Sequence, residues 1–400
     1  MANSSSCEIK VDGDTTPNLS SPKMKVHEIA TTSIVDKNTK FEVEEDDDAN
    51  FVAAALIMQS GTLSMALKAA VELNIFDIMA KAGPDRLLSP KEIVAELPAS
   101  QNPDAASMLD RVLRLLACHS VVSCSFEHTA AVGGGVERRY GLSPISKFFV
   151  GDENGVSLGP FLSLTEDPIV RASWGKFNEA ILEGGISFNK VYGVHAFDYP
   201  RSDPRFNEVF NSAMFNYTTI IIKKILQKYK GFGDITQLVD VGGGLGHTLH
   251  AITSMYPFIK GINFDLPHVI CNAKSYPGIE HIGGDMFQSV PQGDAIFMRW
   301  ILHDWSDDHC LSVLKNCHKA IPENGKVIVV DSIVVEQHET TAIAKTISLM
   351  DVYMMNKNPG GKERTQKEFI ALANAAGFTK IRIVCRVCRV CQVWIMEFHK

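Results

Sequence analysis

From Gln237 to the C-terminus, segments with the pattern of buried strands alternate with segments of helical periodicity. The expected strands are "QLVDVGG", "KGINFDLP", "IEHIGGDMF", "DAIFMRWI", "GKVIVVDSIV" and "VCQVWIMEFH". The expected helices are "HTLHAITSMYP", "SDDHCLSVLKNCHKAI" and "RTQKEFIALANAAGF". Alternating strands and helices form a doubly wound, mainly parallel sheet, with a ligand crevice at the carboxyl ends of the strands. The sequence therefore predicts an α/β, Rossmann-like domain.

Three regions of different composition are expected along the chain. Residues 1–49 are polar and end near the acidic run "EVEEDDD", which indicates a disordered tail. Residues 50–155 have helical periodicity followed by a small strand pair around "VERRYGLSPIS", the pattern of a winged helix. Residues 156–400 hold the α/β domain, preceded by helices at 156–230 that carry aromatic and Met side chains.

Charge and hydropathy narrow the classes of partner. The net charge is -7, and no basic recognition helix is present, so nucleic acid is disfavoured and the winged-helix block is expected to pair subunits. No apolar run reaches the length of a membrane span, so no membrane partner is expected. Without a secretory signal, the nine cysteines are expected to be reduced thiols of a cytoplasmic protein.

The glycine loop after the first strand of the α/β domain predicts a nucleotide cofactor. Gly242, Gly244 and Gly246 lie between a strand and a helix, where glycines let the backbone approach a ligand. Asp265, at the end of the next strand, is placed to hold ribose hydroxyls. A dinucleotide fingerprint requires a third glycine at His247, so the spacing favours S-adenosyl-L-methionine (SAM) over NAD.

A histidine at the end of a strand is the candidate general base. His303 follows the strand "DAIFMRWI", which places it at the crevice. Two acids are candidates to orient its imidazole ring. Asp331 is expected at the end of the fifth strand, and Glu363 follows the tight loop "NPGG". We expect Glu363 to do most of the orienting, because the shorter Asp331 side chain reaches less far.

Two clusters of potential ligands could suggest a metal. Asp304, Asp307, Asp308 and His309 crowd His303, but the second and third of these fit the first turn of a helix. Cys385, Cys388 and Cys391 have C-x-x-C-x-x-C spacing, but on a strand residues three apart point to opposite faces. We therefore predict no metal site.

Seven longer motifs resemble those of one known family. They are "GISFNKVYG", "LVDVGGG", "GINFDLPHVI", "HIGGDMF", "HDWSDDHCL", "ENGKVIVV" and "NPGGKERT". From Asn50 onward the chain resembles the plant SAM-dependent O-methyltransferases of the caffeic acid O-methyltransferase type. The resemblance implies a homodimer with an N-terminal helical dimerisation domain. It also implies metal-independent methylation of a small phenolic substrate.

The resemblance also implies roles for individual residues. The SAM positions of the family fall on Gly242, Asp265, Asp285, Met286 and Arg299. The catalytic positions fall on His303, Asp331 and Glu363, and the substrate pocket positions on Met214, Trp300, Met354 and Asn358.

Five positions depart from the family pattern. Asp331 replaces a Glu, Arg299 a Lys, Thr165 an Asn, and Tyr217 and Lys357 each replace a His. These departures leave the methyl-transfer residues nearly intact but alter the pocket, so caffeic acid, an alkaloid phenol and a flavonoid are all open as substrates. Two other functions are open: a catalytically weak methyltransferase-like subunit that acts as a dimer partner, and an NAD-dependent oxidoreductase.

Overall fold

The computed structural model describes residues 44–98, 101–128, 136–387 and 393–400. The chain divides into two units, residues 1–57 and 58–400. In the first unit the described part belongs to helix α1 (Glu44–Met58). Most of the predicted tail, 1–49, lies outside the described residues, and α1 begins before the position expected for the first helix.

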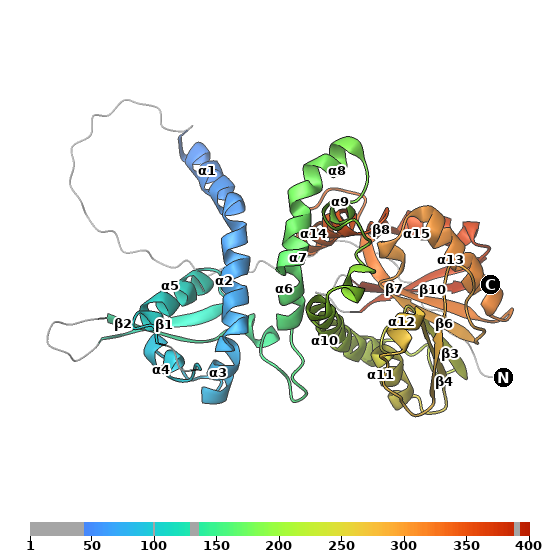
Figure 1. Ribbon diagram of the computed structural model, residues 1–400, viewed down its shortest axis with the longest axis horizontal. Helices are drawn as coiled ribbons and strands as arrows, with labels where there is room; N and C mark the ends of the chain where they lie inside the picture. Colours follow the sequence, from blue (N-terminus) through green and yellow to red (C-terminus); the bar gives the residue numbers. More distant parts are fainter. Residues whose placement is uncertain (1–43, 99–100, 129–135, 388–392) are drawn as a thin grey trace, which may run out of the picture. The chain divides into compact units, whose positions relative to one another are not determined.

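The N-terminal part of the second unit contains four helices and a two-stranded antiparallel sheet (Figure 1). The elements are α2 (Ser60–Glu72), α3 (Ile75–Ala82), α4 (Pro90–Ala95), α5 (Ala105–Cys118), β1 (Val122–His128) and β2 (Val136–Leu142). A capping box begins α4, with Ser89 and Glu92 exchanging both hydrogen bonds. Helix α5 ends at Cys118, and β-branched Val122 already pairs in β1.

A second group of helices leads into the α/β domain. They are α6 (Gly159–Thr165), α7 (Pro168–Ser173), α8 (Phe177–Glu183), α9 (Ser187–Tyr192) and α10 (Pro204–Lys228). Helix α10 begins where the Asp203 side chain accepts from the Phe206 amide at 2.9 Å, with Pro204 in the first helical position. Its C-terminal half buries Ile221, Ile222 and Ile225 against the large sheet.

The large sheet has the predicted doubly wound, mainly parallel arrangement. Its strands are β3 (Gln237–Val241), β4 (Lys260–Asp265), β5 (Ile279–Gly283), β6 (Ala295–Arg299), β7 (Lys326–Val334), β8 (Arg364–Thr365), β9 (Lys380–Arg386) and β10 (Val393–His399). The order is β5-β4-β3-β6-β7-β10-β9, with β8 paired to β7. Strand β10 is antiparallel to both of its neighbours, and the other pairs are parallel.

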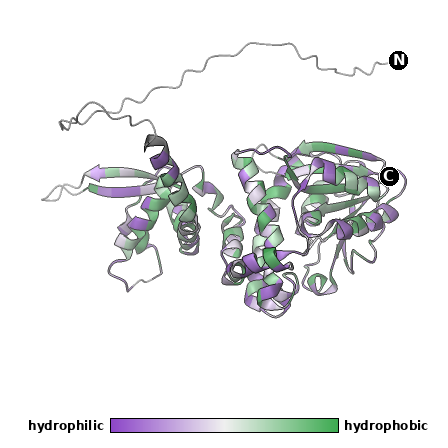
Figure 2. Ribbon diagram, turned by 90° about the horizontal axis from the view of Figure 1, so that it is seen from above, coloured by the Kyte–Doolittle hydropathy of each residue, from purple (hydrophilic) through white to green (hydrophobic). Residues whose placement is uncertain are grey.

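Helices cover both faces of this sheet, and Figure 2 colours much of the sheet as hydrophobic. One face packs on α13 (Asp307–Ala320) and α15 (Gln366–Ala375), and the other on α10 and α11 (His247–Met255). The remaining helices are α12 (Pro267–Ile270) and α14 (Ala342–Lys357). Because every central strand is covered on both faces, functional side chains are confined to the strand ends.

Two features of the sheet region differ from the sequence expectation. Helix α14 was not predicted, because its apolar residues lie on both its buried side (Ile347, Met354) and its exposed side (Leu349, Met355). Asp331 was expected at the end of the fifth strand, but it lies inside β7, which runs to Val334 as the expected segment "GKVIVVDSIV" does. Pairing keeps the strand regular beyond Asp331, because β10 places Trp394 opposite Asp331, and β8 pairs with the last two residues of β7.

Among the described residues, no single helix is long and apolar enough to cross a membrane. Helices α1 and α2 reach that length and hydropathy only when they are taken together as a broken pair.

A buried acid joins the C-terminal strand to the rest of the α/β domain. The Glu397 carboxylate accepts from the Tyr229 hydroxyl at 2.6 Å, Lys326 Nζ at 3.1 Å and Arg382 Nη1 at 3.2 Å. Glu397→Gln removes the charge that these cations face. We expect a free energy of unfolding lower by about 1–3 kcal/mol in chemical denaturation. Tyr229→Phe, which removes one hydrogen bond, should cost about 1 kcal/mol, and wild-type stability of the Glu397→Gln variant would contradict this assignment.

Candidate active site

The glycine loop between β3 and α11 is shaped by contacts that exclude side chains. Gly242 has a left-handed backbone, φ 67°, and a Cβ atom there would lie 2.3 Å from Ile301 Cδ1. Gly244 is also left-handed, φ 57°, but a Cβ atom there would meet nothing within 4 Å. The loop is thus fixed on the protein side at Gly242 and open on the cavity side at Gly244, which fits close approach of a cofactor.

Asp265 ties this loop to the end of β4. Its Oδ2 accepts from the Gly244 amide at 2.8 Å, and its Oδ1 accepts from the Leu266 amide at 2.7 Å. Burial raises the pKa of Asp265, although both amide hydrogen bonds oppose that rise. Each oxygen retains a lone pair, so the carboxylate can also accept from ribose hydroxyls.

A cavity of about 980 Å³ lies at the carboxyl ends of the strands. It is lined by all nine predicted cofactor and substrate residues: Met214, Gly242, Asp265, Asp285, Met286, Arg299, Trp300, Met354 and Asn358. His303 lines it as well. Asp331 and Glu363 are buried behind that wall. The residues predicted from separate strand ends and helices therefore meet around one cavity.

Arg299 presents to this cavity a guanidinium with one nitrogen that has no hydrogen-bond partner. Its Nη2 donates to the Thr218 hydroxyl, the guanidinium carbon lies 4.7 Å from the centroid of the Trp300 ring, and Nη1 is buried without a hydrogen-bond partner. Burial lowers the pKa of Arg299 to about 10, against the raising effect of Tyr217, Asp240 and Asp331. A buried guanidinium with a free donor fits a carboxylate, such as the one on the amino-acid end of SAM.

Trp300 adopts a strained backbone between β6 and the His303 turn. Its φ is 56°, a conformation that costs about 1–3 kcal/mol for a residue other than glycine. This backbone turns the indole ring into the cavity, where it stacks on Tyr217 at 4.6 Å and on His303 at 5.5 Å between centroids. The strained backbone therefore places an aromatic ring beside His303, the candidate base.

The His303 imidazole is held from behind by one predicted acid. Its Nδ1 lies 2.9 Å from Glu363 Oε1, and both side chains are buried. We assign the Nδ1 proton to this hydrogen bond, which leaves the lone pair of the neutral ring on Nε2. Asp304 Oδ1 lies 3.6 Å from Nε2. The nitrogen with the lone pair is thus the one that faces Asp304.

Buried carboxylates set the protonation of His303. Burial by itself lowers the pKa of His303, but the charges of Asp304, Glu363 and Asp331 outweigh it and raise the pKa to about 9. Burial raises the pKa of Asp304 to about 6 and that of Asp331 to about 7, while the His303 charge opposes both shifts. The four groups share a low-dielectric site in which imidazolium is the favoured form at neutral pH.

Asp331, the second predicted acid, does not form a hydrogen bond to His303 as Glu363 does. Among the described residues its side chain forms no hydrogen bond, and its Oδ1 is buried without a partner. Arg299 pairs with Val330, so Asp331 is the first residue of β7 beyond the end of β6. Asp331 therefore acts on His303 through charge alone, as its shorter side chain led us to expect.

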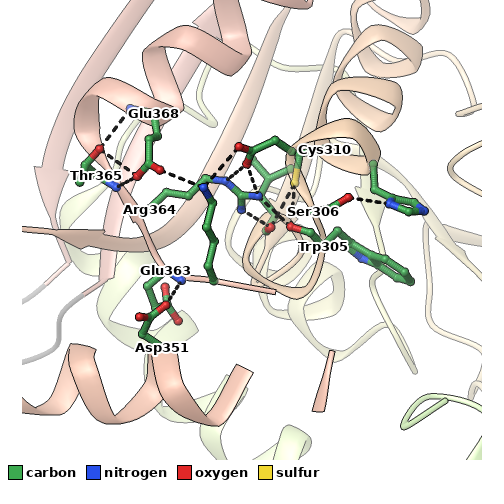
Figure 3. A network of polar contacts seen from close by, with 12 residues as sticks. Trp305, Ser306, Cys310, Asp351, Glu363, Arg364, Thr365 and Glu368 are labelled. Atoms are coloured by element: carbon green, nitrogen blue, oxygen red, sulfur yellow. Dashed lines mark hydrogen bonds and ion pairs between the residues drawn. The ribbon is translucent and has the colours of Figure 1, made fainter. Parts of the chain in front are cut away.

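Arg364 is a residue that the sequence reasoning missed, and it bonds the turn that carries His303. Figure 3 shows the Arg364 guanidinium beside Trp305 of this turn. Its fully buried guanidinium donates to the backbone carbonyls of Leu302 at 2.5 Å and Trp305 at 2.7 Å, on either side of His303. Its Nε donates to Asp307 at 3.0 Å. Because Glu363 precedes Arg364, one strand end fixes both the base and its acid. The adjacency of Glu and Arg in "NPGGKERT" was the available signal.

The acid-rich motif around His303 was one of the two clusters considered as metal ligands. Among the described residues no group of three His, Cys, Asp or Glu side chains could hold a metal ion. Asp307 and Asp308 begin α13, as predicted, and Asn358 donates to Asp304 at 2.6 Å. In the cysteine cluster, Cys385 is a free thiol at the end of β9. Cys388 and Cys391 lie outside the described residues.

A doubly wound sheet with a glycine loop and a buried His–Glu pair at its carboxyl edge is the architecture of a cofactor-binding α/β domain. The O-methyltransferase domain family matches residues 174–379, and the O-methyltransferase dimerisation domain family matches residues 56–152. The chain belongs to the O-methyltransferase family, which confirms the resemblance and the fold class and excludes the oxidoreductase alternative.

Similar proteins include plant enzymes that match nearly end to end. O-methyltransferase 16 of Lophophora williamsii is 58% identical over 89% of this chain and 94% of its own. Caffeic acid 3-O-methyltransferase of Zinnia elegans is 51% identical over 88% of this chain and 99% of its own. The solved structure of human N-acetylserotonin methyltransferase in complex with SAM has a TM-score of 0.72 at 20% identity, covering 88% and 97% of the two chains.

Replacing Arg364 tests whether it positions His303. In Arg364→Lys a single ammonium cannot reach both carbonyls and Asp307, so the turn should loosen. We expect kcat to fall on the order of 10- to 100-fold with KM for SAM unchanged. The midpoint of the pH–rate profile should move toward the ordinary His value. Lys362→Met is the matched control, because within the described residues the Lys362 ammonium bonds Asp307 and Glu368 and neither of the two carbonyls beside His303. A loss of stability without a change in the pH profile would refute the positioning role.

The two acids behind His303 should differ in importance. Glu363→Gln removes the acceptor that sets the ring orientation, so turnover should fall on the order of 100-fold or more. Asp331→Asn removes no hydrogen bond and only a partial charge, since its pKa of about 7 leaves it partly neutral. Its turnover should fall less than about tenfold. Steady-state kinetics at about pH 7.5 compares the turnover of the two variants, at a pH close to the range in which a histidine with a raised pKa changes its protonation. A larger loss of turnover for Asp331→Asn would reverse this ranking.

Proposed function

We propose that this chain methylates a phenolic hydroxyl with SAM as the methyl donor and His303 as the general base. One observation carries the proposal. The imidazole is anchored at Nδ1 by Glu363, its Nε2 has no partner within hydrogen-bond distance among the described residues, and His303 lines the cavity. An anchored histidine with one free nitrogen beside a cavity is what removal of a hydroxyl proton requires.

The cavity has groups that fit each part of SAM. Asp265 would accept from the ribose hydroxyls, Asp285 and Met286 would flank the adenine, and the free Nη1 of Arg299 would bind the carboxylate. The open side of Gly244 leaves room for this ligand. When bound, SAM supplies a methyl group on a sulfonium, which is already activated for transfer.

Apolar side chains of the same cavity would hold the aromatic ring of the phenol. Phe161, Phe210, Met214 and Met354 line it. Aromatic and thioether side chains form a slot that excludes water and holds a planar ring. Trp300 would cover the same ring from the side of His303. The substrate class we propose is a small plant phenol, with phenylpropanoids such as caffeic acid first and alkaloid phenols and flavonoids also open.

The acidity of the base suits the proton that it must take. The hydroxyl O–H bond breaks, the proton moves to Nε2 of His303, and Glu363 stabilises the imidazolium that forms. A phenol has a pKa of roughly 10, and His303 has a pKa of about 9. Because the two values are close, proton transfer costs little free energy once a neutral imidazole faces the hydroxyl.

We also propose that the chain acts as a homodimer. The support is the match of residues 56–152 to the O-methyltransferase dimerisation domain. The described residues of that region form the helices and strand pair that the sequence led us to assign to subunit pairing.

Replacing His303 tests the proposed base. His303→Gln should retain SAM binding by calorimetry, while methylation of a phenol panel, followed by mass spectrometry, should fall about 10²- to 10⁴-fold. In the wild type the neutral form is the active one. Because the pKa of His303 is raised to about 9, kcat/KM should rise with pH well above the ordinary His value of 6.5. Near-normal turnover of the variant, or a profile already flat near neutral pH, would contradict the proposal.

A further inference from the structure

A buried ammonium in the cavity has no acid to pair with. Lys357 is the last residue of α14, is only 6% exposed and lines the cavity with His303. Its Nζ donates to the Tyr353 hydroxyl at 2.9 Å and lies 4.5 Å from the centroid of that ring. Within the described part of the chain, no carboxylate oxygen comes within ion-pair distance of Nζ.

An ammonium in this position is incomplete without a ligand. It has three donors, and the protein provides one neutral acceptor and one aromatic ring. Burying a charge is costly unless hydrogen bonds or an opposite charge compensate it. The remaining donors therefore call for an acceptor that enters the cavity.

The Lys357 ammonium belongs to a group of polar side chains near Nε2 of His303. Its charge acts on Asp304, whose Oδ1 lies 3.6 Å from Nε2 of His303. Asn358, the next residue after Lys357, donates to the same Asp304 oxygen at 2.6 Å. The side chains proposed to hold the aromatic ring are apolar. A second polar group on a substrate ring therefore meets its partners near the hydroxyl that His303 serves.

We propose that Lys357 determines specificity by donating a hydrogen bond to a hydroxyl ortho to the one that is methylated. This inference rests on the proposed function. A hydroxyl can both donate and accept a hydrogen bond, so it can donate one to Asp304 and accept one from Lys357. An ortho methoxy group can only accept, and a ring with a single hydroxyl leaves both charged side chains without a ligand. The substrate class selected is therefore the vicinal diphenol.

Matched substrates separate this role from a structural one. We would compare 3,4-dihydroxycinnamic acid with a monohydroxy analogue. The analogue keeps the hydroxyl that is methylated and has a hydrogen in place of the other one. In Lys357→Met, kcat/KM for the diphenol should fall on the order of 10- to 100-fold, the range expected for a lost hydrogen bond to a charged donor. The analogue should change less than about threefold, because its contact with Lys357 is already missing.

Two further variants control for folding and for charge. Lys345→Met makes the same substitution at an exposed position on α14 that does not line the cavity, and it should leave both substrates unaffected. Lys357→Arg keeps a cationic donor and should retain more of the diphenol preference than Lys357→Met. Melting temperature and SAM affinity of each variant should stay near wild type.

The outcomes distinguish the two proposals. If wild-type protein methylates the diphenol but Lys357→Met loses the same factor on both substrates, Lys357 has no role in selection. If the wild type methylates neither substrate nor any phenol in a wider panel, the proposed function itself fails. A selective loss on the diphenol supports the role of Lys357.

Discussion

The hydrogen bonds from Arg364 to the turn at Leu302–Trp305 are the constraint on which the candidate active site depends. The turn leaves two backbone carbonyls in the protein interior, where an unpartnered carbonyl costs about 1–3 kcal/mol. A fully buried guanidinium satisfies both and is balanced by Asp307. The same strand end provides Glu363, so the anchor and the acid that bonds His303 cannot move independently. The geometry of the base is thus a consequence of backbone hydrogen bonding.

This arrangement places several charges in the protein interior, and stability is lower as a result. The folded pKa values of Asp304 and Asp331, about 6 and 7, are raised above the ordinary 3.8, so the folded state binds more protons in that range. Stability from these groups is therefore present at low pH and lost as pH rises through those folded values. The pKa of His303 is raised from 6.5 to about 9, so this residue contributes fully to stability below pH 6.5 and loses that contribution as the pH rises through about 9. The site is thus most stable when His303 is protonated, and under the proposed function this is the form that cannot take the proton of a hydroxyl, so stability and activity would conflict.

The sequence predicted the parts of this structure that depend on local patterns. Strand and helix alternation, the glycine loop and His303 after its strand are all readable from neighbouring residues. Arg364 was missed because its partners are backbone carbonyls about sixty positions away, which leave no side-chain pattern. Helix α14 was missed because its apolar residues face two sides, and the burial of Lys357 depends on where that helix lies. The placement of Asp331 inside β7, and not at its end, depends on pairing with β10, the last strand of the chain.

In the proposed function, the residues that would perform chemistry and those that would select the substrate come from different elements. His303 and Glu363 lie beside strand ends of the large sheet, where hydrogen bonds fix the backbone. Tyr353, Met354, Lys357 and Asn358 come from the last turn of α14 and the residue after it. Substitutions in that turn change the groups facing a substrate without disturbing the Arg364 anchor or the His303–Glu363 bond. Asp304 is the point of contact between the two sets, because it adjoins Nε2 and is bonded by Asn358. Under the proposed function, substitutions in this one helical turn would change the substrate that is accepted and leave the reaction intact, as long as Asp304 stays in place.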